Sequence, residues 1–126
     1  MNTEKVIFGF FITLAATLNF GFWIGDMDRP ELHSIWGLVA AIVVNLIATV
    51  LKFGDRTQLG AVHLATSLVA DLQLMTGAVI WWFASSGTGE ISGQAMSQVV
   101  SMSGGALFAN LISVVLMVSE TITIRR

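Results

Sequence analysis

The sequence contains few charged residues, no cysteine, no tyrosine and a single proline. Charged residues make up 11% of the 126 residues, whereas a soluble domain usually carries about 25%. Without cysteine, the chain can form neither disulfides nor thiolate metal sites. Its net charge of −2 provides no basic face for nucleic acid, so no nucleic-acid partner is expected. This composition excludes an ordinary soluble domain and disulfide-linked secreted folds.

Long apolar segments take up most of the chain. Hydrophobic residues make up 55% of it, and the mean hydropathy is +0.80. A helix needs about 20 apolar residues, within a range of about 17–25, to cross a bilayer. Four segments meet this requirement: residues 6–24, 34–51, 59–84 and 95–118. The sequence therefore predicts an all-α integral membrane four-helix bundle, with residues 1–126 forming one transmembrane domain in a lipid bilayer.

The basic and aromatic residues predict the orientation of the bundle. Loops on the cytoplasmic side carry an excess of Lys and Arg, and tryptophan is enriched at membrane interfaces. With the N-terminus inside, only Arg29 lies outside, and all four tryptophans (residues 23, 36, 81 and 82) lie at the outer interface. Both termini are therefore predicted to be cytoplasmic, in a bacterial inner membrane. The predicted cytoplasmic basic residues are Lys5, Lys52, Arg56, Arg125 and Arg126.

Segments of the two halves of the chain resemble each other. Residues 45–51 match residues 110–116 at five of seven positions, beginning with Asn45 and Asn110. Residues 13–20 match residues 67–74 at three of eight, which aligns Thr17 with Asp71. The order is the same in both halves, as in a duplicated two-helix hairpin. Chance is the alternative, because Leu, Ala and Val are abundant throughout.

One carboxylate, Asp71, lies in the middle of the third apolar segment, close to the predicted midplane. A charge at that depth costs at least a few kcal/mol. Gln73, Asn45 and Asn110 fall within about one helical turn of the same depth, and no Lys or Arg does. The layer predicts an ion or proton site in which Asp71 is protonated, holds a cation or faces water. The alternative is a neutral Asp71 that only joins helices through hydrogen bonds to the amides.

Two further groups of polar residues accompany this layer. His63 and Ser67 precede Asp71 at intervals of four residues and predict a proton path along one side of the helix, although an interfacial histidine would give the same pattern. The outer loop holds the acidic residues Asp26, Asp28 and Glu31 beside His33. These acids predict a vestibule that attracts cations, or else an ordinary solvated loop. The identity of any metal remains open.

Small residues recur every four positions in three of the segments, which allows close helix packing within the bundle or between copies of the chain. No catalytic motif is present, so an enzyme is not expected, nor is a cofactor other than a bound cation. We expect a small ion-conducting or ion-coupled transport protein, selective for cations or protons, that acts as a homo-oligomer. The alternative is a non-transporting accessory or scaffold subunit of a larger membrane complex.

Overall fold

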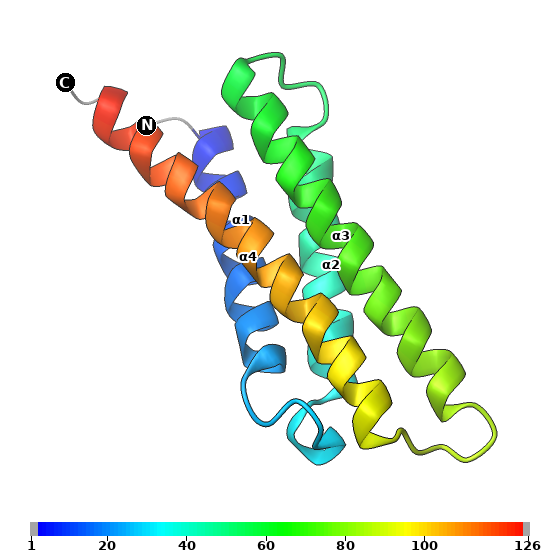
Figure 1. Ribbon diagram of the computed structural model, residues 1–126. Coiled ribbons are helices and arrows are strands. Elements are labelled where there is room, and N and C mark those ends of the chain that lie inside the picture. Colours follow the sequence, from blue (N-terminus) through cyan, green and yellow to red (C-terminus); the bar gives the residue numbers. More distant parts are fainter. Residues whose placement is uncertain (1–2, 125–126) are drawn as a thin grey trace.

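The computed structural model describes residues 3–124, which form four long helices (Figure 1). The helices are α1 (Thr3–Trp23), α2 (Ile35–Lys52), α3 (Gln58–Ser85) and α4 (Gly93–Ile124), with a short 3₁₀ helix, η1 (Pro30–Leu32), between α1 and α2. All four are long and apolar enough to span a membrane. The predicted all-helical fold with four spans is confirmed, and the described residues contain no strand.

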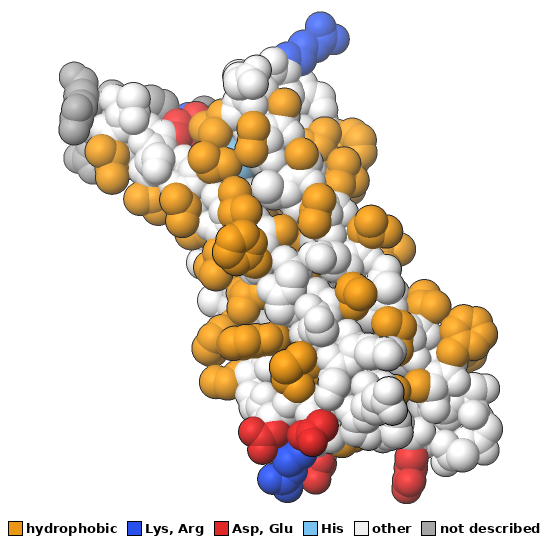
Figure 2. All heavy atoms as spheres, viewed as in Figure 1, with side chains coloured by type: hydrophobic (Ala, Val, Ile, Leu, Met, Phe, Trp, Pro, Cys, Tyr) orange, Lys and Arg blue, Asp and Glu red, His pale blue; other side chains and the backbone are white. Residues whose placement is uncertain are grey.

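The four helices form a ring in which α1 contacts α2 and α4, and α3 contacts α2 and α4. The start of α1, the end of α4 and the α2–α3 loop lie at one end of the bundle, called here the terminal end (Figure 1). The loops α1–α2 and α3–α4 lie at the other end, called the loop end. Figure 2 shows hydrophobic side chains along the length of the bundle and, at the loop end, several acidic side chains together with a basic one.

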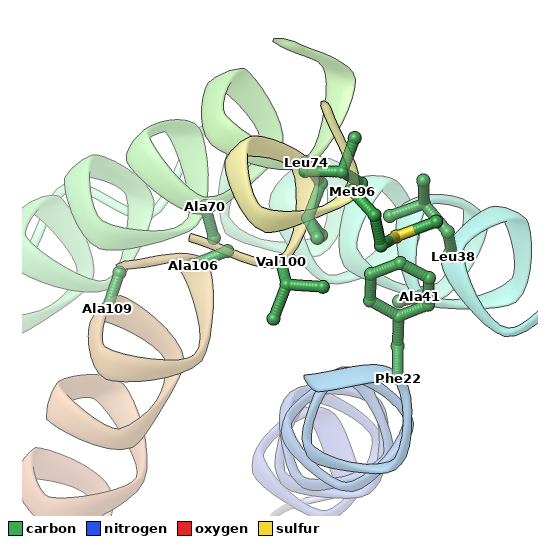
Figure 3. Packing of buried hydrophobic residues seen from close by; sticks show 10 residues of the cluster. Phe22, Leu38, Ala41, Ala70, Leu74, Met96, Val100, Ala106 and Ala109 are labelled. Carbon is green, nitrogen blue, oxygen red and sulfur yellow. The ribbon is translucent and has the colours of Figure 1, made fainter. Parts of the chain in front are cut away.

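The apolar core joins all four helices near the loop end (Figure 3). Phe22 of α1, Leu38 of α2, Leu74 of α3 and Met96 of α4 fill this part of the bundle. Farther along, alanines line the contact between α3 and α4, where small side chains let two helices approach closely. These contacts fix the rotation of each helix about its axis, and so determine which polar residues face inward.

The helix ends agree with the predicted segments to within two or three residues, except at the end of α4. The fourth apolar segment was expected to end at Val118, but α4 continues to Ile124. The hydroxyls of Thr121 and Thr123 donate to the carbonyl oxygens four residues earlier, at 3.0 and 2.9 Å. Glu120 forms a salt bridge of 3.2 Å with Lys5 of α1. Because these interactions satisfy its polar side chains, the helix extends beyond the apolar segment.

The tryptophans and most of the basic residues used to predict the orientation lie at opposite ends of the bundle. The four tryptophans lie on the last turns of α1 and α3 and the first turn of α2, at the loop end. Lys5, Lys52 and Arg56 belong to the terminal end. Arg125 and Arg126, which completed the charge argument, lie outside the described residues.

Candidate functional site

Asp71 of α3 is buried inside the bundle, with 6% of its surface exposed, and is bound by two residues of α2. Asn45 Nδ2 donates to Asp71 Oδ1 at 2.6 Å, and Thr49 Oγ1 donates to Asp71 Oδ2 at 2.5 Å. Asn45 and Thr49 are four residues apart and therefore lie on the same face of α2. Among residues 3–124, the salt bridges involve Lys5, Arg29 and Lys52, and none includes Asp71. Its neighbours in the bundle are thus neutral hydrogen-bond donors.

The Thr49 hydroxyl lies between two oxygen atoms but has only one hydrogen to donate. It is 2.5 Å from Asp71 Oδ2 and 3.0 Å from the backbone oxygen of Asn45. If Asp71 is ionised, the hydroxyl donates to the carboxylate and cannot donate to the backbone. If Asp71 is protonated on Oδ2, it donates to Thr49, and Thr49 donates to Asn45 O. The protonated carboxyl therefore uses both short contacts without any movement of the three groups.

Several fully buried polar atoms near this pair have no hydrogen-bond partner among the described residues. They are Asn45 Oδ1, Ser67 Oγ, and both Nδ2 and Oδ1 of Asn110. Asn45 lies against Ser67, because its Nδ2 also donates to Ser67 O at 3.3 Å.

The register of the antiparallel helices α3 and α4 places Asn110 opposite Ser67. His63 contacts Ser113, and Gln73 lies against Gly105. On α3, Ser67 lies between His63 and Gln73. On α4, Asn110 lies between Gly105 and Ser113. Asn45, Ser67 and Asn110 are thus fully buried at a similar level of the bundle, on three different helices.

Gln73, which was predicted to support Asp71, lies elsewhere. Two residues along a helix correspond to a rotation of about 200°, so Gln73 and Asp71 point in nearly opposite directions. The Gln73 amide lies over Gly105 of α4, where a Cβ would come within 2.5 Å of its nitrogen. It lines an open, mostly apolar groove of about 460 Å³ between α3 and α4. The structure therefore brings Asn45 to Asp71 but not Gln73.

His63 joins the buried polar residues to a cavity of about 710 Å³ at the terminal end. Its Nδ1 lies 3.0 Å from Ser113 Oγ, which lies 2.7 Å from Thr66 Oγ1. The ring of Phe8 packs against the imidazole edge-on, with centroids 5.0 Å apart. His63, Ser67 and Asp71 are all buried, so the predicted row of polar residues on α3 faces the interior. The charged residues that line the cavity are Glu4, Lys5, Lys52, Asp55 and Glu120.

Asp55 organises the loop beside this cavity. It accepts hydrogen bonds from the Thr57 hydroxyl at 2.7 Å and the Thr57 N–H at 3.0 Å, and Lys52 lies 3.4 Å away. These bonds, the Thr57 hydroxyl first, lower the pKa of Asp55 from 3.8 to about 2. Thr57 Oγ1 in turn accepts from Gly60 N at 2.9 Å and caps α3. Gly60 packs so tightly against the Asp55 carboxylate that a Cβ would collide with it.

The acidic residues of the other loop remain exposed and do not form a site with His33. Asp26, Asp28 and Glu31 are exposed, and Arg29 pairs with Glu31 at 3.4 Å. His33 is buried instead, with Nδ1 2.5 Å from Phe22 O and Nε2 2.8 Å from Asp26 O. Within residues 3–124, no group of three His, Cys, Asp or Glu side chains is placed to hold a metal ion.

Sequence reasoning missed two residues that the structure makes important. Thr49 is a hydroxyl residue in an apolar helix, and its spacing of four from Asn45 was the available signal. Asn19 of α1 was not assigned a role from the sequence. The Asn19 side-chain amide contacts the Ser103 hydroxyl at 2.7 Å. When the amide nitrogen faces Ser103, the amide oxygen accepts a hydrogen bond from Leu107 N at 2.9 Å. Asn19 therefore belongs to a second polar contact, between α1 and α4.

Comparison with known proteins gives a family and no function. No curated protein and no solved structure matches the chain. A family described as one of unknown function, DUF6394, matches residues 32–121. This region holds α2, α3 and nearly all of α4, and with them Asn45, Thr49, Ser67, Asp71 and Asn110. Because the match covers most of the chain, the protein belongs to the DUF6394 family.

Proposed function

We propose that this protein is a small ion-coupled transport protein of the membrane, in which Asp71 binds and releases a proton or a cation. One observation carries the proposal: a carboxyl group inside the helix bundle is bonded to two neutral donors, and no salt bridge within residues 3–124 includes it. An ionisable residue in such a segment is rare and is commonly part of an ion or proton pathway. The hydroxyl of Thr49 accommodates the protonated form without rearrangement.

The enclosure of Asp71 favours a coupled carrier over an open channel. Its carboxyl group lies between α2 and α3 of a single bundle rather than on a lipid-facing surface. An ion that reaches it must enter between the helices of one chain. The cavity at the terminal end, with His63 at its inner wall, is the entrance that the proposal uses.

The proposal includes an orientation and a location. The terminal end, with Lys5, Lys52 and Arg56, faces the cytoplasm, and the acidic loop end faces outward, because basic residues are retained on the cytoplasmic side. The membrane is the bacterial inner membrane. Four helices enclose a small interior, so the protein acts as a homo-oligomer that packs through its stripes of small residues. The exposed loop carboxylates of Asp26 and Asp28 would attract cations to the outer face.

The burial pattern supports a duplicated hairpin with one change of alignment. Adding 65 to four of the five buried α2 positions, 38, 41, 45 and 48, gives a buried position of α4, whereas Thr49 maps to the half-buried Val114. Adding 55 to the buried α1 positions 8, 12, 15, 16, 19 and 22 gives buried positions of α3. This alignment pairs Asp71 with Ala16, not with the exposed Thr17. The first half then carries a methyl group at the position of the carboxylate.

Flux through reconstituted liposomes tests the proposal. Wild-type protein should carry protons or Na⁺ down an imposed gradient, and Asp71→Asn should reduce the flux to that of empty vesicles. The matched control is Glu90→Gln, which removes an exposed carboxylate from the α3–α4 loop and should leave flux unchanged. Equal flux from wild type and Asp71→Asn would contradict the assignment.

A second function, as a non-transporting accessory subunit of a larger membrane complex, has one observation in its favour. Asp71 is hydrogen-bonded on both oxygens to α2, which would also suit a purely structural link between helices. A stable partner recovered with the protein from its own membrane, together with no flux from purified wild type, would favour this function.

A further inference from the structure

Four of the buried atoms without partners in residues 3–124 belong to Asn45, Ser67 and Asn110, and a fifth, Gln73 Oε1, lies away from Asp71. On α3, Ser67 lies between His63 and Asp71. Buried polar groups in proteins are nearly always hydrogen-bonded to protein or to ordered water. Here one atom of Asn45, the hydroxyl of Ser67 and both atoms of the Asn110 amide have no protein partner among the described residues. The three side chains are completely buried and come from three different helices.

The chemistry of these atoms matches water. Asn45 Oδ1 and Asn110 Oδ1 accept hydrogen bonds, Asn110 Nδ2 donates them, and the Ser67 hydroxyl does both. A buried water molecule typically makes about three such bonds to otherwise unsatisfied groups. A metal ion would use only the oxygens and would leave the Asn110 amide nitrogen without an acceptor.

We propose that Asn45, Ser67 and Asn110 bind buried water that connects Asp71 with the cavity at the terminal end. Asn45 contacts Asp71 at 2.6 Å on one side of the water site. On the other side, Ser113 lies one turn beyond Asn110 on α4 and contacts His63, which lines the cavity. A proton entering from the cavity passes along His63, Ser113 and the water to the Asp71 carboxylate, and it leaves by the reverse path.

The proposal rests on the proposed function in taking Asp71 as the proton site, and it names the transported ion as H⁺. The titratable or charged groups around the entrance are His63 itself and, at the cavity wall, Glu4, Lys5, Lys52, Asp55 and Glu120. Lys5 pairs with Glu120 and Lys52 with Asp55. Each of these two lysines at the cavity therefore has a carboxylate as its counter-ion. None of these ion pairs includes His63.

Infrared spectroscopy of the protein in bilayers tests the water site without measuring transport. A protonated carboxyl group has a C=O band that shifts when its proton is exchanged for deuterium. The band of Asp71 is identified by its loss in Asp71→Asn. In wild type, transfer to D₂O should shift this band at once. In Ser67→Ala and Asn110→Leu, exchange should be at least about tenfold slower, because it must then await local opening of the bundle.

Two further variants serve as controls. Ser101→Ala alters an exposed serine of α4. In this variant the Asp71 carboxyl proton should exchange with deuterium as fast as in wild type. Asn110→Ser keeps a polar group beside the water, so exchange of the Asp71 proton should remain fast in this variant. Slow exchange in Asn110→Leu would then result from the loss of the polar group and not from any change at position 110. Ser67→Ala removes one atom and favours the helix, since Ala has a higher helix propensity than Ser, so it remains informative if Asn110→Leu does not fold.

Several results would overturn the proposal. Unchanged exchange in Ser67→Ala, with a higher melting temperature, would mean that the unpartnered hydroxyl is dry. The absence of any band sensitive to Asp71→Asn would mean that Asp71 is not protonated. Loss of the band on adding Na⁺ would identify a metal-ion site. If the liposomes show no flux but exchange of the Asp71 proton depends on Ser67, the proposed transport function is wrong and the water site is supported. If flux depends on Asp71 but exchange does not depend on Ser67, the water path is wrong and the proposed function is supported.

Discussion

Replacing Asp71 by asparagine and by leucine should separate the hydrogen-bonding role of the side chain from its charge. The asparagine of the Asp71→Asn variant can reproduce the bonds of a protonated aspartic acid. Its side-chain oxygen accepts from Asn45 Nδ2, and its side-chain nitrogen donates to Thr49 Oγ1, leaving the Thr49 hydrogen for the Asn45 backbone oxygen. We therefore expect Asp71→Asn to change the free energy of unfolding by less than about 0.5 kcal/mol, since no hydrogen bond is lost.

Asp71→Leu has a similar shape but removes both bonds to α2. Thr49 can still donate to the Asn45 backbone at 3.0 Å, whereas Asn45 Nδ2 keeps only its longer bond to Ser67 O at 3.3 Å. Interhelical hydrogen bonds in membranes contribute about 0.6 kcal/mol on average and up to about 1.7 kcal/mol. Loss of two such bonds gives an expected destabilisation of about 1–3 kcal/mol.

Equilibrium unfolding in mixed micelles, followed by circular dichroism, measures both changes. A double-mutant cycle with Thr49→Val isolates the Thr49–Asp71 bond. Thr49→Val should destabilise wild type and Asp71→Asn to a similar extent and should have a smaller effect in Asp71→Leu. If Asp71→Asn is as destabilising as Asp71→Leu, the native bundle requires a charged carboxylate, and the reasoning from a protonated Asp71 is wrong.

The other predictions concern the two ends of the bundle. Gly93→Ala should destabilise the protein by about 1–3 kcal/mol, because its Cβ would lie 2.5 Å from the backbone oxygen of Asp28. Gly21→Ala, with nothing within 4 Å, should stabilise α1 by up to about 1 kcal/mol in the same unfolding assay. Because its pKa is lowered from 3.8 to about 2, Asp55 contributes stability above pH 3.8 that is lost as the pH falls toward 2. Asp55→Asn should remove this acid dependence, with a loss at neutral pH of less than about 1 kcal/mol since the group is solvent-accessible; an unchanged acid profile would contradict the assignment.

The sequence alone predicted the number of helices and nearly all of their ends. Long apolar segments separated by short polar loops leave few alternatives. Backbone groups in lipid must be hydrogen-bonded within the protein, and a helix of about 20 apolar residues does this within one segment. Helix α4 continues to Ile124, past the predicted apolar segment that ends at Val118, because the residues after it are polar but still helical. Their partners, Lys5 and the preceding turn of the helix, make them helical.

Depth in the bundle was also available from the sequence, because it follows from a count of residues along each helix. Asp71 and Asn45 were expected at the same level, and they form a hydrogen bond. Asn110 was expected there too, and it is fully buried.

The tertiary structure decided which residues of that layer face one another. Direction around a helix axis depends on the packing of neighbouring helices, and here contacts such as Gln73 on Gly105 set it. That rotation turns Gln73 away from Asp71 and directs Ser67 inward. It also brings Thr49 to the carboxylate, and the loop fold buries His33 between two carbonyl oxygens. No count along the chain contains this information, because it arises only when side chains from different helices compete for the same interior.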